Sequence, residues 1–383
     1  MIDPAAKTPT HPHPAPPDGD GKATAAVDAI TLDAVLDDPT PDVIDPARST
    51  HGDVSEAVAE EGISFAQRLR QPRTIISFLV AVAIIVLVVL RLNINVGEVW
   101  RNVRNANPWL LVCAFLIYYI SFPVRAVRWH IILGNAGYDR AHGIDTPNVY
   151  GLMEIIILSW FANTLLPAKL GDVYRGYLFK KATGVSFTRS VGTILAERLM
   201  DILVLFAFLV VSGLLVFGNT LPRVAVTLFI FGGALAVFGL AGLLVLRRAE
   251  GLLERIVPQK ISMQYRRLEE GIFGSFGRWP ALTGLTTLIW TQEGLRVFFI
   301  TRALGIHVSL AVTIFVALAA SLLTTIPLTP AGLGAVETGI VGVLQWVGVD
   351  RNAAASVAVI DRVIDYWSVL IVGLVIYVIS KRK

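Results

Sequence analysis

Apolar runs of membrane-spanning length recur along this chain, and they limit the folds open to it more than any other feature. The first, "IISFLVAVAIIVLVVL", occupies Ile75 to Leu90 and contains no charged residue. With a mean hydropathy of +0.64 and 16% charged residues, such runs predict an all-α, polytopic membrane helix bundle. We expect about eight spans, at Ile75–Leu90, Pro108–Leu133, Val149–Leu166, Thr188–Phe217, Val224–Leu246, Ala281–Arg302, Leu310–Ile326 and Ala353–Ser380.

The first 72 residues have the opposite character and are predicted to form a disordered acidic tail ahead of a membrane domain at 73–383. Between Met1 and Gly62 lie thirteen acidic and three basic residues, nine of the nineteen prolines and no aromatic residue. This composition cannot bury enough apolar surface to offset the entropy of the chain. We expect no signal peptide, because the first apolar run begins past residue 70. A solvated spacer and a segment that recruits partners are both open for the tail.

The chain has few residues suited to disulfide or metal chemistry. Cys113 is the only cysteine and lies in an apolar run, and no two of the six histidines have the spacing of metal ligands. We therefore expect no metal and no cofactor.

A basic, amphipathic segment at residues 247–280 separates the apolar runs. We predict a helix on the cytoplasmic membrane surface, in contact with anionic headgroups, and a helix packed against the bundle is the alternative. The apolar residues that recur there at intervals of three or four are Ile261, Tyr265, Leu268, Ile272, Phe276 and Trp279.

Two related motifs, "LLPAKLGDVYRG" and "LTPAGLGAVETG", indicate an internal repeat. Five of their positions match at an offset of 163 residues, and "ERLMD" further along matches "DRVID" at an offset of 164. Upstream of the motifs, Arg125 matches Arg296. This shared order predicts a duplicated unit, with repeat one at about 108–246 and repeat two at 281–380.

The charge distribution predicts how the repeats face the membrane. If each motif segment crosses as a broken helix, the basic segment 247–280 and both termini lie in the cytoplasm, as the positive-inside rule favours. If the motif segments enter and return on one side, four spans separate the repeats and the basic segment lies outside. We therefore expect crossing segments, an inverted repeat and a multi-pass protein of the plasma membrane.

Six charged residues fall inside two of the predicted spans. A charge at the bilayer centre costs about 2.5–3.5 kcal/mol on insertion scales, so these residues are expected to face the interior of the bundle. Three roles are open: a clasp that holds the two repeats together, the lining of a polar path for a charged substrate, or proton coupling through a carboxylate. The six residues are Glu197, Arg198, Asp201, Asp361, Arg362 and Asp365.

The two motif segments combine helix breakers with charge. Pro167 is expected to end the preceding helix and Gly171 to permit close backbone approach, leaving helix-end amides free to bind an anion beside Lys169 and Arg175. The second copy has Glu337 as its main charge, which suits a cation or a hydrogen-bond donor. Re-entrant segments whose charges satisfy only each other are the alternative.

These motifs resemble a known family. "NTLLPAKLGDVYRGYL" with "AERLMD", followed by "IPLTPAGLGAVE" and "DRVID", is similar to the flippase-like family named for the transmembrane region of lysylphosphatidylglycerol synthase. That region forms the membrane half of bacterial multiple peptide resistance factors, and the likeness covers about residues 73–383. The resemblance implies movement of lipids or lipid-linked groups between leaflets. Lysyl transfer is not expected, because the sequence shows no aminoacyltransferase domain.

The resemblance also implies which residues act. Those expected to bind substrate are Asn163, Lys169, Asp172, Arg175, Glu197, Arg198, Asp201, Glu337 and Arg362, and those expected to shape the backbone are Pro167, Gly171, Pro330, Gly332 and Gly334.

The leading hypothesis is a flippase for an anionic or zwitterionic phospholipid or a lipid-linked polar headgroup, with its phosphate bound by Lys169, Arg175 and Arg198. No G-x-x-x-x-G-K-[ST] loop is present, so ATP is not expected to drive transport directly. The alternative is a membrane-embedded enzyme or accessory subunit in envelope lipid or glycolipid assembly, although the motifs contain no His or Cys nucleophile. The expected partners are membrane lipids and not nucleic acid, and the small residues of Gly232–Leu244 could pack within the bundle or between protomers.

Overall fold

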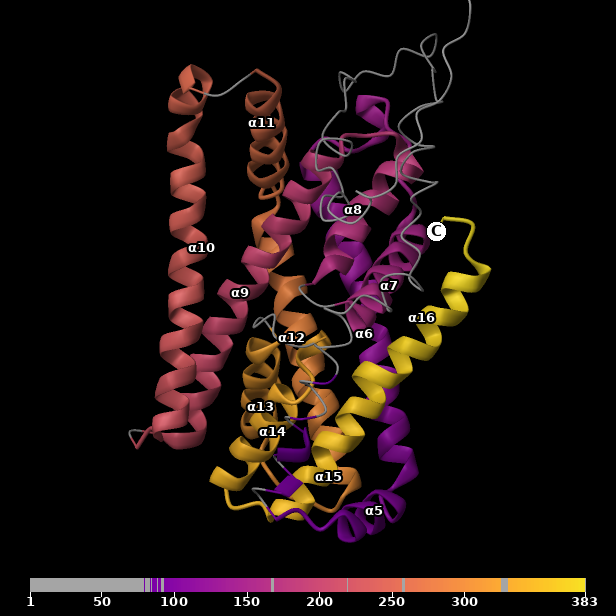
Figure 1. The fold of residues 1–383 in the computed structure, drawn as a ribbon, viewed down its shortest axis with the longest axis vertical. Helices are drawn as coiled ribbons and strands as arrows, with labels where there is room; N and C mark the ends of the chain where they lie inside the picture. Colours follow the sequence, from indigo (N-terminus) through magenta and orange to yellow (C-terminus); the bar gives the residue numbers. More distant parts are fainter. Residues whose placement is uncertain are drawn as a thin grey trace, which may run out of the picture.

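The computed structural model describes residues 93–166, 169–218, 220–256, 259–324 and 330–382, with scattered helical positions between 79 and 90. Every element assigned within these ranges is a helix (Figure 1), which confirms the predicted all-α class. The acidic tail and most of the first predicted span lie outside the described residues, so the expectations about them stay predictions.

Several helices begin where the sequence offers a capping side chain. Asn107, Asn148 and Ser186 each accept a hydrogen bond from a backbone N–H in the first turn of the helix that follows. Such a bond satisfies an amide that has no partner within the helix. The helices are α5 (Val96–Arg104), α6 (Pro108–Asn135), α7 (Val149–Leu165), α8 (Leu170–Thr183), α9 (Phe187–Phe217), α10 (Arg223–Ile256), α11 (Gln259–Gly274), α12 (Trp279–Ala303), α13 (Leu310–Leu323), α14 (Ala335–Trp346), α15 (Arg351–Arg362) and α16 (Ser368–Ile379), with short turns η1 (Arg140–His142), η2 (Pro330–Gly332) and η3 (Val363–Trp367).

Four helical stretches in the described residues are long and apolar enough to cross a membrane: Pro108–His142, Phe187–Phe217, Arg223–Arg248 and Arg351–Ile379. The expectation of eight spans is therefore met only in part. Two of the predicted spans correspond to the shorter apolar helices α7 and α13, of 17 and 14 residues. A third, α12, has 25 residues and carries charged side chains within its apolar sequence.

Helices α6 and α12 pack side by side in opposite directions. At one end, the backbone N–H of Asn107 donates to the carbonyl of Ala303, at 2.9 Å. At the other end, Asn135 Nδ2 donates to the carbonyl of Ser275, also at 2.9 Å. The start of α6 thus lies beside the end of α12, and the end of α6 beside the start of α12.

Helices α7 and α8 form a hairpin in the half of the bundle where α6 ends (Figure 1). Close to the turn, Ser159 Oγ donates to the carbonyl of Gly171 at 2.7 Å, and Asn163 Oδ1 accepts from Gly171 N–H at 2.8 Å. Towards the open end, the ring of Phe179 on α8 lies 5.6 Å from that of Tyr138, just past the end of α6. The first motif therefore enters the bundle and returns to the same end, and the expected crossing is not what the structure shows.

Helices α13 and α14 form a second hairpin at the opposite end. A Cβ atom at Gly339 would lie 2.5 Å from Leu323 Cδ1, so the two helices touch next to the turn that joins them. The chain enters α13 from the end of α12. It then passes from α14 into α15, where Asn352 Nδ2 donates to Glu98 on α5 at 2.7 Å. Both open ends of this hairpin thus lie where α6 begins.

Helix α11 packs against α9 and lies beside the long helix α10 (Figure 1). The two helices meet through glycines: a Cβ on Gly192 would lie 2.5 Å from the carbonyl oxygen of Leu268, and one on Gly271 would lie 2.2 Å from that of Arg189. Of the two expectations for this basic segment, the contacts agree with a helix packed against the bundle. Its contact with lipid headgroups stays a prediction.

Candidate functional site

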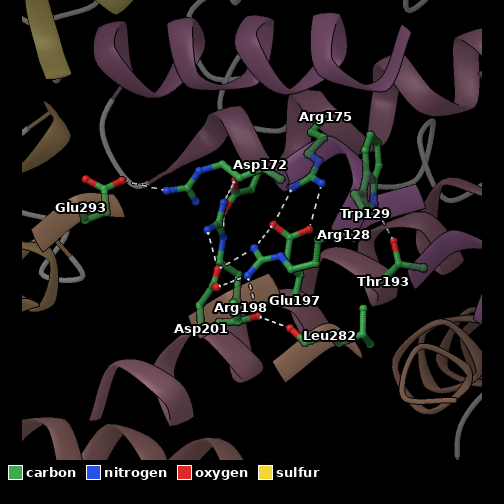
Figure 2. Close-up of polar contacts among 12 residues, drawn as sticks. Arg128, Trp129, Asp172, Arg175, Thr193, Glu197, Arg198, Asp201, Leu282 and Glu293 are labelled. Carbon is green, nitrogen blue, oxygen red and sulfur yellow. Dashed lines mark hydrogen bonds and ion pairs between the residues drawn. The ribbon is translucent and has the colours of Figure 1, made fainter. Parts of the chain in front are cut away.

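A buried cluster of ion pairs lies where the first hairpin meets α6 and α9, and we call it the first cluster (Figure 2). Glu197 on α9 is its centre: its carboxylate accepts from Arg128 Nη2 at 2.9 Å and from both terminal nitrogens of Arg175, at 3.1 and 2.9 Å. The guanidinium of Arg175 also lies over the ring of Trp129, 3.8 Å from its centroid. Glu197, Arg128 and Arg175 have at most 3% of their side-chain surface exposed, so each charge depends on its protein partners.

The first cluster extends to a more accessible pair at the start of α8. Arg198 on α9 donates to both carboxylate oxygens of Asp172, from Nε at 2.9 Å and from Nη2 at 2.8 Å. A second carboxylate, Asp201, lies 3.4 Å from Arg198 Nη1 and 2.5 Å from Nη1 of Arg128. Arg198 and Asp172 keep 28% and 17% of their side-chain surface exposed. The planar guanidinium is therefore held in a fixed orientation while remaining reachable by a ligand.

The turn of the first hairpin brings the remaining residues of the first motif together. Lys169 is exposed and has a left-handed backbone conformation, with φ of 54°. Gly171 leaves no room for a side chain, because a Cβ atom there would lie 2.0 Å from the carbonyl oxygen of Ser159. The amide of Gly171 is not free for an anion as expected, since it already donates to Asn163. Pro167 lies outside the described residues.

A second buried cluster lies around Arg296 on α12, and we call it the second cluster. Arg296 faces three carboxylates: Asp361 at 3.1 Å, Glu293 at 3.4 Å and Asp365 at 3.8 Å. Arg362 on α15 is paired with Asp365 at 3.3 Å and with Glu337 of the second hairpin. Arg125 on α6 is the third guanidinium of this cluster, 2.9 Å from Glu293. The second cluster therefore ties α12, α14 and α15 to α6, and the first cluster ties α6, α8 and α9 together.

The turn of the second hairpin is closed by its own motif residues. Glu337 Oε2 accepts from the N–H of Gly334 at 2.6 Å, and Oε1 of the same carboxylate lies 2.9 Å from Nε of Arg362. Gly332 and Gly334 have φ angles of 69° and 89°, which glycine adopts without the strain that other residues would meet. Pro330 begins the short turn η2 between the two helices. The role of these positions in shaping the backbone stays a prediction.

The two clusters are joined through α6 and α12. Arg125 Nη2 on α6 donates to Glu293 Oε1 on α12 at 2.9 Å, and Arg128 Nη1 donates to Thr286 Oγ1 at 2.9 Å. Arg198 and Arg362, by contrast, have ion-pair partners only within their own clusters among the described residues. Arg125 and Arg128 thus connect α6 to α12. Arg198 instead pairs with Asp172 of the first hairpin, and Arg362 pairs with Glu337 of the second.

Sequence reasoning missed two members of these clusters, Arg128 and Glu293. The sequence match aligns Arg125 with Arg296. Arg296 pairs with the two acids of α15 and η3, but the residue that pairs with the two acids of α9 is Arg128, one turn after Arg125. The sequence held a signal for both: Arg125 and Arg128 are three residues apart in one predicted span, and so are Glu293 and Arg296 in another. Charges at this spacing share a helix face and need an interior partner.

The polar chemistry of both clusters is that of carboxylates and guanidiniums. In the part of the chain that the structure describes, no His, Cys, Asp and Glu side chains are grouped as metal ligands. Guanidinium groups held in place by carboxylates can exchange a carboxylate for a phosphate, because both anions accept paired hydrogen bonds. The arrangement is chemically able to bind an anion.

Comparison with known proteins agrees with the motifs. The model of the family described as lysylphosphatidylglycerol synthase TM region matches residues 75–373. UPF0104 membrane protein MJ1078 of Methanocaldococcus jannaschii is 35% identical over 231 residues, which cover 58% of this chain and 95% of that protein. A UPF0104 membrane protein of Methanothermobacter thermautotrophicus is 26% identical over 316 residues, covering 76% of this chain and 90% of its own.

One similar protein has an informative name. Glycosyltransferase AglD of Haloferax volcanii is 26% identical over 351 residues, which cover 80% of this chain and 54% of that protein. The resemblance inferred from the two motifs is confirmed by the family match over residues 75–373. This membrane protein therefore belongs to the lysylphosphatidylglycerol synthase transmembrane-region family.

Proposed function

We propose that this protein moves a phospholipid or a lipid-linked polar headgroup between membrane leaflets, without direct use of ATP. The observation that carries the proposal is the Arg198–Asp172 pair at the turn of the first hairpin. It is held by two hydrogen bonds of 2.9 and 2.8 Å, yet 28% of the Arg198 side chain is exposed. Lys169 is exposed at the same turn and adds a second cation. An incoming phosphate would bind these cations and displace the carboxylate of Asp172 from the guanidinium.

The arrangement of helices supports the proposal. We take α6–α9 and α12–α16 as two inverted copies, because α6 and α12 are antiparallel and the hairpins enter from opposite ends of the bundle. Transporters of this kind place substrate sites at interrupted helices near the middle of the membrane. The headgroup would pass the interior charges while its acyl chains stay in lipid.

We further propose that the end of the bundle where α6 stops faces the cytoplasm of a cell whose plasma membrane holds the protein. Helix α11 of the basic segment lies at this end (Figure 1), and Arg382 near the C-terminus has its Nε 3.3 Å from Glu154 Oε2 in the first half of α7. Loops rich in Lys and Arg stay on the cytoplasmic side of most membrane proteins. Because each motif is a hairpin, this orientation does not require the motif segments to cross.

Reconstitution into liposomes tests the flippase. Vesicles would carry a phospholipid labelled on its headgroup, and a quencher that cannot cross the membrane would be added outside. We expect label in the inner leaflet to become reachable when the wild-type protein is present, but not with Arg198→Ala. Arg140→Ala is the matched control, since Arg140 is exposed, pairs with Asp145 beyond the end of α6 and belongs to neither cluster; it should behave as the wild type.

The liposome result has a clear contrary outcome. If inner-leaflet label stays protected for every phospholipid and lipid-linked sugar tried, as in empty vesicles, the protein is not a flippase for those lipids. If Arg198→Ala lowers the amount of folded protein and the surviving fraction transports normally, the pair has a structural role only.

A second candidate function is that of a membrane subunit in glycolipid assembly. The similarity to glycosyltransferase AglD supports it, because the match covers 54% of that protein and leaves its remainder unmatched. This alternative predicts that a sugar-bearing lipid co-purifies with the protein. Mass spectrometry of the extracted lipids would show it, and recovery of phospholipids alone would favour the flippase.

A further inference from the structure

The two buried clusters differ in their balance of charge. The first cluster pairs three carboxylates with three guanidiniums, whereas the second pairs four carboxylates with three guanidiniums, one of them supplied by α6. The first set is Asp172, Glu197, Asp201, Arg128, Arg175 and Arg198, and the second is Glu293, Glu337, Asp361, Asp365, Arg125, Arg296 and Arg362. The second cluster thus has one negative charge too many.

The surplus is concentrated at Asp361. Its side chain keeps only 2% of its surface exposed, and its nearest cation is Arg296, at 3.1 Å from Oδ1. Arg296 is shared with Glu293 and Asp365, and Oδ1 of Asp361 accepts no hydrogen bond from any described residue. A buried carboxylate with a shared cation and an oxygen that accepts no hydrogen bond is unstable in its charged form.

The matching position in repeat one, Glu197, shows what is missing. Glu197 is as deeply buried, at 3% exposure, but it accepts three hydrogen bonds from two arginines. One of these arginines, Arg175, comes from α8 of the first hairpin. The corresponding helix of the second hairpin, α14 from Ala335 to Trp346, contains no Lys, Arg or His. Repeat two therefore lacks the cation that neutralises the same carboxylate in repeat one.

We propose that a proton takes the place of this missing cation, so that Asp361 is a proton-binding site of the folded protein. With one proton on Asp361, the second cluster has three charged carboxylates and three guanidiniums, like the first. It also provides an O–H donor in a site crowded with acceptors. The charged and titratable groups that face this site are Glu293 and Arg296 from α12, Glu337 from α14, Arg362 and Asp365 from α15 and η3, and Tyr118 and Arg125 from α6.

The proton on Asp361 would couple lipid movement to a proton gradient, a role that rests on the proposed flippase function. Glu337 of the second hairpin and Asp361 share one network through Arg362, Asp365 and Arg296. A movement of the hairpin that frees Arg362 from Glu337 would let the guanidinium compensate Asp361 and release its proton. Lipid movement would then respond to a proton gradient.

Infrared difference spectroscopy of the purified protein in lipid tests the proton directly. We expect the C=O stretching band of a protonated carboxyl group at neutral pH in the wild type, its loss in Asp361→Asn, and its retention in the matched control Glu197→Gln. If the band is absent from the wild type, or is unchanged in Asp361→Asn, the proposal is overturned. Should Asp361→Asn fail to fold, Asp361→Glu must shift the band, and carbon-13 labelling of aspartate must shift it in the wild type.

A transport measurement separates the proton site from the flippase. In the liposome assay, an imposed pH gradient should change the rate of the wild type and leave that of Asp361→Asn unaffected. A wild-type rate that ignores the gradient would overturn the coupling. If no lipid moves in any sample, the proposed flippase function fails, while the infrared band still decides whether Asp361 is protonated.

Discussion

Arg198 links the accessible part of the first cluster to its buried part, because it binds Asp172 on one side and Asp201 on the other. Removing its side chain in Arg198→Ala leaves Asp172 without its arginine. We expect a loss of about 2–3 kcal/mol in the free energy of unfolding, somewhat less than for a fully buried pair. Thermal unfolding of detergent-purified protein would show the loss as a lower melting temperature.

A double-mutant cycle isolates the Arg198–Asp172 contact from other effects of each change. If the pair is stabilising, Asp172→Ala combined with Arg198→Ala should cost less than the sum of the two single variants, since neither charge is then left alone. Strictly additive losses would contradict the coupling and would mean that the 2.8 Å contact contributes little.

At the level of single residues, the sequence identified the charges on α9 and α15 because an ionised group in an apolar run must have an interior partner. It could not identify the partners. Arg128 and Glu293 belong to α6 and α12, and only the packing of these antiparallel helices brings them next to the motif charges. Sequence alignment of the two motifs pairs Arg125 with Arg296. The rotation of α6 about its axis instead turns Arg128, one turn further along, towards the acids of α9.

The first hairpin depends on close contact between its two helices. Gly171 on α8 lies so near α7 that a Cβ atom would be 2.0 Å from the carbonyl oxygen of Ser159. In Gly171→Ala the helices must separate, and the bonds from Ser159 and to Asn163 weaken. We expect a destabilisation of roughly 1–3 kcal/mol, as in other overpacked sites, together with loss of transport.

A glycine of the second hairpin provides the control for this prediction. A Cβ atom added at Gly342 on α14 would have no heavy atom within 4 Å outside its own helix turn, so Gly342→Ala should raise stability by roughly 0.5–1 kcal/mol through better helix propensity. Both variants can be compared by thermal unfolding. If Gly171→Ala changed stability as Gly342→Ala does, helix propensity and not the contact with α7 would determine the effect of a side chain at position 171 of α8.

The apolar runs predict where helices form, but they do not predict which helices are long enough to cross the membrane. The runs at Val149–Leu166 and Leu310–Ile326 are apolar throughout, and hydropathy cannot distinguish a short span from one arm of a buried hairpin. The distinguishing feature is length: α7 and α13, at 17 and 14 residues, rise only about 25 and 21 Å at ~1.5 Å per residue, less than the ~30 Å of hydrocarbon. Each is followed by a motif that turns the chain back.

At the scale of the whole molecule, the hairpins decide which loops share a side of the membrane. Residues before α7 and after α8 lie at the same end of the bundle, and the loop after α12 lies at the other. Three single-cysteine variants in a Cys113→Ala background report this arrangement: Arg140→Cys, Lys181→Cys and His307→Cys, all at surface positions in loops or at a helix end. A maleimide that cannot cross the membrane would be applied to intact cells and to inverted vesicles.

We expect Arg140→Cys and Lys181→Cys to react from the same side, and His307→Cys from the opposite side. The reason is that α7 and α8 fold back on one another through Gly171, so the chain makes no net crossing between residues 140 and 181. If the first motif crossed the membrane as a broken helix, these two cysteines would react from opposite sides, and that result would contradict the hairpin. By the positive-inside rule, the shared side should be the cytoplasm, so both should react in inverted vesicles and stay protected in intact cells.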